Sequence, residues 1–143
     1  MSEYSRYEQA VKSAEGKGCV VVAPGPRELF LDIDDAQSLA VFTRNVEKLR
    51  EVVPLTHSKR PSPSGAEGRY HIVVTLERDL VGVQERILLQ ALLGSDLTRE
   101  VLSYQRAVRG DDVPTLFFER KGGAYDPSHD VAMKPSEIDE LLG

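Results

Sequence analysis

Hydrophobic and polar residues alternate along several short stretches of the chain, with the period of two that is typical of β-strands. The clearest stretch is residues 28–34, where one face carries Leu29, Leu31 and Ile33 and the other carries Phe30, Asp32 and Asp34. Residues 70–76 alternate in the same way, and His71 lies near their start. Residues 19–23 and 115–119 are short apolar runs that predict buried strands, and residues 55–58 predict another short one.

Between these stretches the apolar residues recur every three or four positions, which indicates amphipathic helices. We expect helices over residues 3–14, from 34 or 35 to about 52, over 83–93, from 95 or 96 to about 108, and over 135–142. Asp34 or Asp35 could be the N-cap of the second helix, and Asp34 is the better candidate because Gln37 stands three residues later as a capping-box partner.

The order of these elements predicts an α+β fold in a single domain, residues 1–143. Its sheet is expected to be mostly antiparallel, with about four to five strands covered by helices. The prolines at 24 and 26 predict a turn, so residues 19–23 and 28–34 are expected to form a hairpin. Residues 122–133 are expected to be loose.

The composition is that of a globular protein, with 41% hydrophobic and 29% charged residues among 143. A single cysteine, Cys19, excludes an internal disulfide and a thiolate metal cluster. The first 15 residues lack a signal-peptide core, and no stretch reaches the ~20 apolar residues of a membrane span. We therefore expect a cytoplasmic protein with no membrane partner. The net charge of −5 gives no general attraction to nucleic acid.

Asp32 and Asp34 are the first candidates for chemistry. They are two residues apart on a predicted strand, so both side chains leave the same face, with Cα atoms about 7 Å apart. Two carboxylates at this spacing can converge on a divalent cation such as Mg²⁺ or Mn²⁺. The structural alternative is that Asp34 or Asp35 caps the next helix and Asp32 is an exposed strand residue.

The loop before residues 70–76 is a second candidate, because it is rich in serine and glycine. Its backbone N–H groups and the hydroxyls of Ser62 and Ser64, together with Arg69 and His71, could bind a phosphate group. The alternative is a surface loop followed by a partly buried, hydrogen-bonded histidine.

A third polar group lies in the predicted helix that begins at 95 or 96. Arg99 and Arg106 are seven residues apart and share a helix face, so they could bind phosphate groups. Equally, they could belong to a solvated face on which Arg99 pairs with Asp96. Glu119, at the end of a predicted strand, is a further carboxylate that a metal site could use.

Taken in order, these motifs resemble the catalytic core of the archaeo-eukaryotic primase (primase-polymerase) superfamily. The matching stretches are the hydrophobic-Asp-x-Asp of residues 29–34, the Ser/Gly loop and Tyr-His of residues 64–74, and residues 95–109. The resemblance implies that Asp32 and Asp34 bind Mg²⁺ or Mn²⁺, and that His71 contacts the phosphates of a nucleoside triphosphate. It also implies a third catalytic acid, for which Asp96 is preferred and Glu119 is the fallback. The surrounding sequence also resembles small proteins of phages and actinobacteria, a likeness that implies no particular activity.

Two other classes of function stay open. One is a non-catalytic binding module for nucleotide, single-stranded nucleic acid or a protein partner, and the other is a phage or host accessory protein whose acids are caps and surface residues. Only 6% of residues are aromatic, and Phe30, Phe117 and Phe118 are expected in the core, which favours a protein partner over nucleic acid. Convergence of three acids would favour the enzyme, and a polar concave pocket would favour a binding module.

Overall fold

The computed structural model describes residues 6–16, 19–63 and 66–120. Within these ranges the chain forms four helices and five strands, which confirms the α+β class expected from the sequence. The helices are α1 (Arg6–Gly16), α2 (Ala36–Arg50), α3 (Val83–Leu92) and α4 (Leu97–Val108). The strands are β1 (Cys19–Val22), β2 (Glu28–Ile33), β3 (Leu55–Pro61), β4 (Tyr70–Leu76) and β5 (Phe117–Arg120). The loose segment expected at 122–133 and the helix expected at 135–142 lie outside the described residues.

The central sheet contains β2, β4 and β3 in that order, and both pairings are antiparallel. Helix α2 joins β2 to β3, so β4 enters the sheet between two strands that precede it in the chain. β3 continues to Pro61, three residues beyond the strand expected from the sequence. This extension brings Arg60 opposite His71 of β4. None of the helices in the described ranges is long and apolar enough to span a bilayer.

β1 and β5 form a separate two-stranded antiparallel sheet, which we call the ribbon. The expected hairpin between residues 19–23 and 28–34 is therefore wrong, because β1 pairs with β5 and β2 pairs with β4. A turn in which the Glu28 N–H donates to the Gly25 carbonyl (3.1 Å) leads the chain from one layer to the next. Val22 and Phe30 consequently meet face to face in a shared core.

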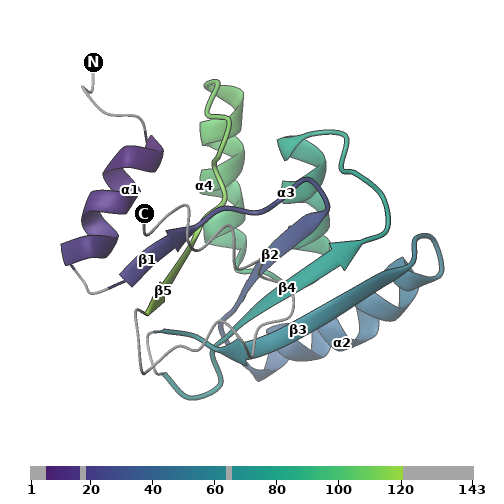
Figure 1. Cartoon of the computed structure of the whole chain (residues 1–143). Helices are drawn as coiled ribbons and strands as arrows, with labels where there is room; N and C mark the ends of the chain where they lie inside the picture. Colours follow the sequence, from purple (N-terminus) through teal and green to yellow (C-terminus); the bar gives the residue numbers. More distant parts are fainter. Residues whose placement is uncertain (1–5, 17–18, 64–65, 121–143) are drawn as a thin grey trace.

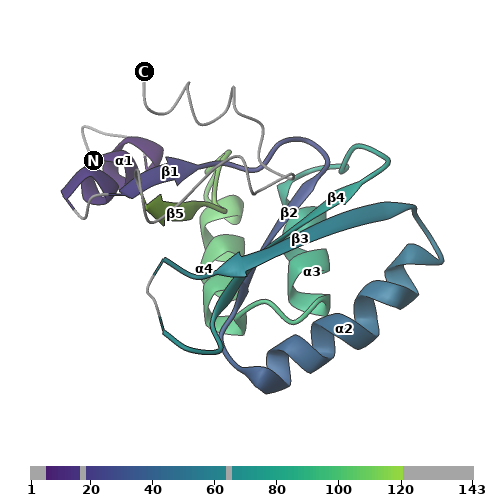
Figure 2. The same ribbon diagram turned by 60° about the horizontal axis from the view of Figure 1, so that its bottom comes forward.

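Three apolar clusters hold the layers together. The largest lies between the central sheet and α2, the helix behind β3 in Figure 1, and the second lies between the opposite sheet face and the ribbon. The third packs α1 on the outer face of the ribbon. Figure 2 shows the resulting order of α1, ribbon, central sheet and α2. The two faces of β2 enter different cores, as the alternation of residues 28–34 predicts: Leu29, Leu31 and Ile33 face α2, and Phe30 faces the ribbon.

β2 has a strand neighbour on one side only, and side chains of α3 and α4 replace a strand on the other. A bare strand edge exposes backbone donors and acceptors that need partners when buried. Here the carbonyl of Glu28 accepts from Arg86 Nε (2.9 Å), and the carbonyl of Phe30 accepts from Arg99 Nη1 (2.7 Å). The N–H of Phe30 donates to Gln90 Oε1 (2.8 Å). The N–H of Asp32 donates to Ser95 Oγ (2.9 Å), and its carbonyl accepts from the N–H of Asp96 (2.8 Å). These bonds fix the start of α4 against the residue that carries the Asp32 carboxylate.

Candidate functional site

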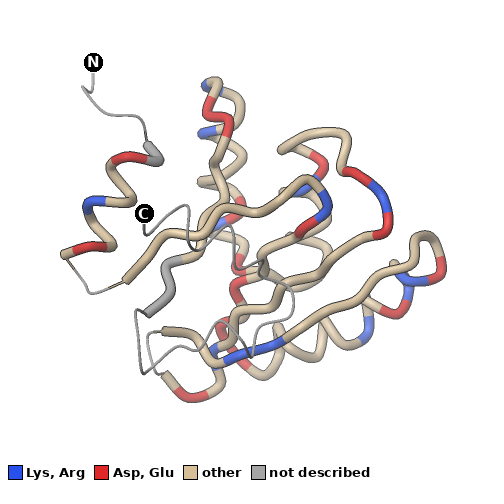
Figure 3. The backbone as a smooth tube through the Cα atoms, viewed as in Figure 1, with Lys and Arg blue, Asp and Glu red and all other residues tan. Residues whose placement is uncertain are grey.

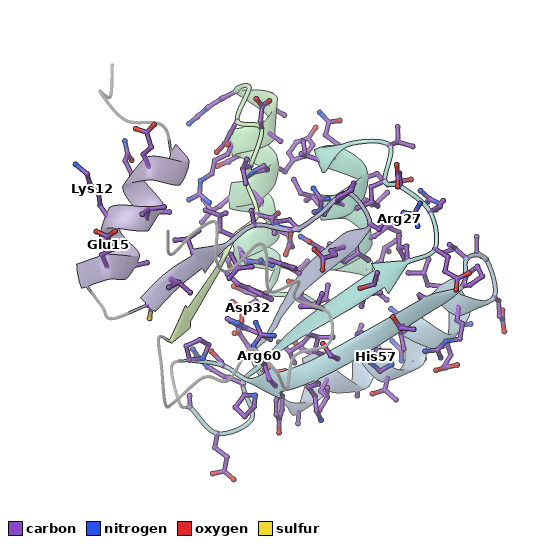
Figure 4. All side chains as sticks on the ribbon, viewed as in Figure 1. Lys12, Glu15, Arg27, Asp32, His57 and Arg60 are labelled. Atoms are coloured by element: carbon purple, nitrogen blue, oxygen red, sulfur yellow. The ribbon has the colours of Figure 1, made fainter. Side chains whose placement is uncertain are left out.

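A row of three polar side chains crosses one end of the central sheet. Asp32 on β2 lies opposite His71 on β4, and His71 lies opposite Arg60 on β3. Cross-strand partners point to the same face with Cβ atoms about 4.5–5.5 Å apart, so the three side chains are neighbours. Figure 4 shows Asp32 and Arg60 close together at this end of the sheet, whereas His57 lies farther along β3. The row therefore lies on the sheet face that turns toward the ribbon.

The row borders a pocket with a volume of about 270 Å³. Its lining residues are Asp32, Ser62, Pro63, His71, Arg99, Leu116 and Phe117. They come from the central sheet, the segment after β3, helix α4 and the start of the ribbon strand β5, so the pocket exists only when all of these elements are assembled. Its lining includes an acid, a histidine, a serine and an arginine, which makes it polar and concave enough to bind a small charged ligand.

Phe117 forms the apolar side of the pocket. Its ring stacks on His71 (centroids 3.9 Å apart, planes within 6°) and on Phe30 (4.5 Å, 8°). The guanidinium carbons of Arg60 and Arg99 lie 5.9 Å and 5.3 Å from the centroid of the same ring, within the range of cation–π attraction. The ribbon therefore orients the imidazole of His71 and gathers two arginines around one aromatic ring.

Arg99 is held at the pocket by a buried carboxylate. Its Nη1 donates to Glu100 Oε2 (2.7 Å) and Ser95 Oγ (3.1 Å), in addition to the Phe30 carbonyl. Glu100 is only 2% exposed, and it also accepts hydrogen bonds from Ser95 Oγ (2.7 Å) and Gln90 Nε2 (2.8 Å). Arg99 Nη2 is buried and has no hydrogen-bond partner within the described part of the chain. This nitrogen is a donor that an acceptor in the pocket could satisfy.

Asp34 and Asp96 place further negative charge beside Asp32. Partial burial raises the pKa of Asp34, and repulsion from Asp32 and Asp96 raises it further, whereas Arg69 lowers it. The backbone N–H of Asp96 donates to the Asp32 carbonyl at 2.8 Å. Three of the four acids named from the sequence, Asp32, Asp34 and Asp96, are therefore brought into one region.

Of the two candidate caps, Asp35 is the N-cap of α2, so the preference for Asp34 is wrong. Asp35 has extended backbone, and its Oδ1 accepts a hydrogen bond from the Ser38 N–H (2.8 Å), which lowers the pKa of Asp35. β2 ends at Ile33 and α2 begins at Ala36, so the cap falls one residue later than the Gln37 spacing suggested. The carboxylate of Asp34 therefore does not cap α2 and could bind a ligand instead.

The three acids do not form a closed metal cage. Among the residues that the structure describes, no group of three or more His, Cys, Asp or Glu side chains is arranged to hold a metal ion. The three-carboxylate arrangement of Asp32, Asp34 and Asp96 expected from the sequence is thus not formed. Mg²⁺, however, is usually held by one or two carboxylates, with water and substrate phosphates as its other ligands. The oxygen donors of Asp32 and Asp34 fit that smaller ligand set.

The other predicted residues lie differently from expectation. Arg69 is exposed and acts on Asp34 through its charge, without lining the pocket. Arg106 does not line the pocket either, because seven residues place it about 10 Å along α4 from Arg99. Arg99 pairs with Glu100 rather than with Asp96. Ser64 and the side chain of Glu119 lie outside the described part.

Ser62 belongs to the loop expected to bind phosphate, and it lines the pocket. Arg60, the cross-strand neighbour of His71, was not proposed as a site residue, and Arg99 was weighed only as a helix-face residue. Arg60 could have been found by extending the strand expected at 55–58 through Lys59, Arg60 and Pro61, which the structure shows to be part of β3. β3 is an edge strand, and edge strands tolerate lysine and proline. Continuing the strand through this segment would have placed Arg60 in the row.

Comparisons with models of protein families, with curated proteins and with solved structures found no match. The function is therefore inferred from the residues of this site.

Proposed function

We propose that this chain is a nucleotidyltransferase-like domain of the primase-polymerase type, which binds a nucleoside triphosphate together with a divalent cation. The observation that carries the proposal is the cross-strand pairing of Asp32 with His71 beside a pocket that Arg99 also lines. The resemblance to primase-polymerases requires a metal-binding acid and a phosphate-binding histidine as close neighbours, and the pairing of Asp32 with His71 supports it.

The basic side of the pocket supports binding of the triphosphate. His71 and Arg99 line it, Arg60 is the cross-strand neighbour of His71, and Ser62 adds a hydroxyl group. Phosphate oxygens are strong acceptors that pair well with guanidinium groups. A phosphate oxygen would give the buried Arg99 Nη2 the acceptor that it lacks.

The acidic side supports binding of the cation. Asp32 and Asp34 would contribute carboxylate oxygens, and the bound metal would polarise the phosphate and stabilise the charge that develops on it. Figure 3 shows Lys and Arg mixed with Asp and Glu mainly along the helices, and at the pocket an acid, Asp32, lies near a base, Arg99. A metal–triphosphate complex carries both signs of charge, so it matches this lining better than a simple cation or a simple anion.

The side chains around the pocket have separable roles in this proposal. Phe117 holds the imidazole of His71 in one orientation by stacking. Glu100 and Ser95 hold Arg99, and Ser95 also binds the backbone of Asp32. Single-stranded nucleic acid is the template that such a domain would use, and the same preparation can be assayed for its binding.

The test is a calorimetric titration of Mn²⁺ into the full chain, with and without ATP. Nucleotide-dependent Mn²⁺ binding is expected for the wild type, with a loss of at least tenfold in affinity for Asp32→Asn. Arg99→Met is expected to weaken ATP binding while retaining the carboxylate pair. Asp112→Asn, an exposed acid in the turn after α4, is the matched control and should bind like the wild type.

Circular dichroism and thermal melting must show that each variant is folded. Absence of nucleotide-dependent Mn²⁺ binding in the folded wild type would refute the proposal. Equal Mn²⁺ binding by the wild type and Asp32→Asn would show that Asp32 is not a ligand of the cation.

A further inference from the structure

Helices α3 and α4 expose an unusual concentration of large apolar side chains. Nine large hydrophobic residues are exposed in the described part of the chain, and eight of them lie on α3, on α4 or just before α3. The ninth, Val52, lies directly after α2. Monomeric soluble proteins rarely expose contiguous apolar patches of more than a few hundred Å². This concentration therefore indicates an interface.

The exposed side chains border a groove between the two helices, with a volume of about 660 Å³. Val81 and Leu88 line it from the side of α3, and Leu97, Val101 and Tyr104 line it from α4. These five residues are between 51% and 88% exposed. The pocket around His71 shares no residue with this groove, so the two surfaces are distinct.

The spacing along α4 is that of a helix–helix seam. Leu97, Val101, Tyr104 and Val108 follow one another at steps of four, three and four residues, and all four are exposed. Such steps keep apolar side chains on one line, which is the pattern that packs helices in coiled coils and four-helix bundles. A surface helix that faces only water would carry polar residues along this line.

The groove offers no unsatisfied charge to a charged partner. Its acidic lining residues are Glu85 and Glu100, and both are engaged. Glu85 pairs with Arg78 (2.9 Å) and accepts from the Val81 N–H, and Glu100 pairs with Arg99. An acidic chain with a net charge of −5 repels a copy of itself over most orientations. At this face, however, apolar side chains of one copy would face apolar side chains of the other, so like charges would not be brought together.

We propose that this face binds the same face of a second copy of the chain. The paired α3 and α4 helices of two copies would form a four-helix arrangement around a two-fold axis, with Tyr104 as an aromatic anchor. The five lining residues and Val108 present on the order of 600 Å², which approaches the ~800 Å² that each partner of a standard interface buries. The proposal does not depend on the nucleotide site.

The test is the molar mass of the full chain by sedimentation velocity and light scattering, over a wide range of concentrations. The wild type is expected to reach twice the chain mass of 15.9 kDa. Leu88→Glu and Val101→Glu should each remain folded and give the mass of one chain, because burying a charge in the apolar interface is unfavourable. Val52→Glu, an equally drastic change at an exposed valine outside the face, should stay dimeric.

Cross-linking identifies the face independently of these variants. A single cysteine placed at Val101, in a Cys19→Ala background, should join two chains through a short bis-maleimide, and one placed at Val52 should not. A wild type with the mass of one chain at every concentration would overturn the proposal. A dimer that persists in both glutamate variants would overturn it as well, because another surface would then hold the copies together. A wild type of one chain whose glutamate variants lose stability would also overturn it, and would indicate that the chain covers its own groove.

Discussion

The side-chain oxygen of Gln90 accepts a hydrogen bond from the backbone N–H of Phe30 at 2.8 Å, in the position where a neighbouring strand would supply a carbonyl. Gln90 is fully buried, and its amide nitrogen donates to Glu100 Oε1 at 2.8 Å. One glutamine therefore closes the open edge of β2 and orients the carboxylate that holds Arg99. The edge of the sheet and the basic side of the pocket are thus built from one hydrogen-bond network.

Replacing Gln90 with methionine should destabilise the protein by about 2 kcal/mol or more, because the Phe30 N–H and the Glu100 carboxylate would each lose a buried partner. Urea unfolding monitored by circular dichroism measures this loss. Gln105→Met is the matched control, since Gln105 is exposed on α4, and its change should stay within about 0.5 kcal/mol. Equal stability of the two variants would mean that Gln90 does not satisfy the strand edge.

Phe117→Leu should weaken ligand binding at the pocket as well as stability. The leucine keeps the site apolar but removes the ring that stacks on His71 and Phe30, at a cost of about 1 kcal/mol in the free energy of unfolding. We expect a severalfold loss of nucleotide affinity, because the imidazole is no longer held in one orientation. Phe42→Leu is the control: it alters the core between the sheet and α2, and should lower stability without changing affinity. The same loss of affinity in both variants would argue against an orienting role for Phe117.

Much of the fold could be predicted from the alternation of residues, because burial on two faces determines which positions are apolar. Residues 28–34 and 70–76 show both faces of β2 and β4, and these assignments are confirmed. The partner of a strand is not encoded in this way. β1 is apolar because the ribbon is covered on both faces, and the same pattern would arise in a hairpin with β2. The choice of β5 as partner depends on long-range packing, including the stack of Phe30 on Phe117.

The candidate site shows the same division between local and long-range information. Asp32 and His71 could be named because each interrupts an apolar strand with a polar residue. Arg99 could be placed on a helix, but its position at the pocket follows from its bond to the Phe30 carbonyl, which is distant in sequence. Arg60 depends on the register of an edge strand, which its own sequence specifies weakly.

His57 should make stability depend on pH. His57 is largely exposed, but its ring packs edge-on against Phe42 of α2, and this partial burial lowers its pKa; Arg50 lowers the pKa further, whereas Glu47 raises it. The folded-state pKa is below the ordinary value of 6.5, so the unfolded chain takes up the proton first as the pH falls. Stability is therefore expected to decrease as the pH drops through 6.5 toward the folded-state pKa.

The measurement compares urea unfolding of the wild type and His57→Gln from about pH 8 to about pH 5.5, a range in which histidine titrates. The wild type should lose more stability than the variant over this range, because the other histidines are common to both. A variant that loses as much as the wild type would show that His57 titrates alike in both states.

Gly94, which ends the α3 segment, should be intolerant of a side chain for two separate reasons. Its φ of +92° is one that residues with a Cβ rarely adopt, and a Cβ at this position would lie 2.7 Å from the carbonyl oxygen of Ser38 in α2. Gly110 has the same φ of +92° but has no atom within 4 Å of such a Cβ. Gly110→Ala should therefore cost only the about 1–2 kcal/mol of the left-handed conformation. Gly94→Ala should cost more, about 3 kcal/mol or above, because α2 must also shift away. Unfolding in urea gives both values, and equal losses would show that the approach of α2 to Gly94 contributes nothing to the fold.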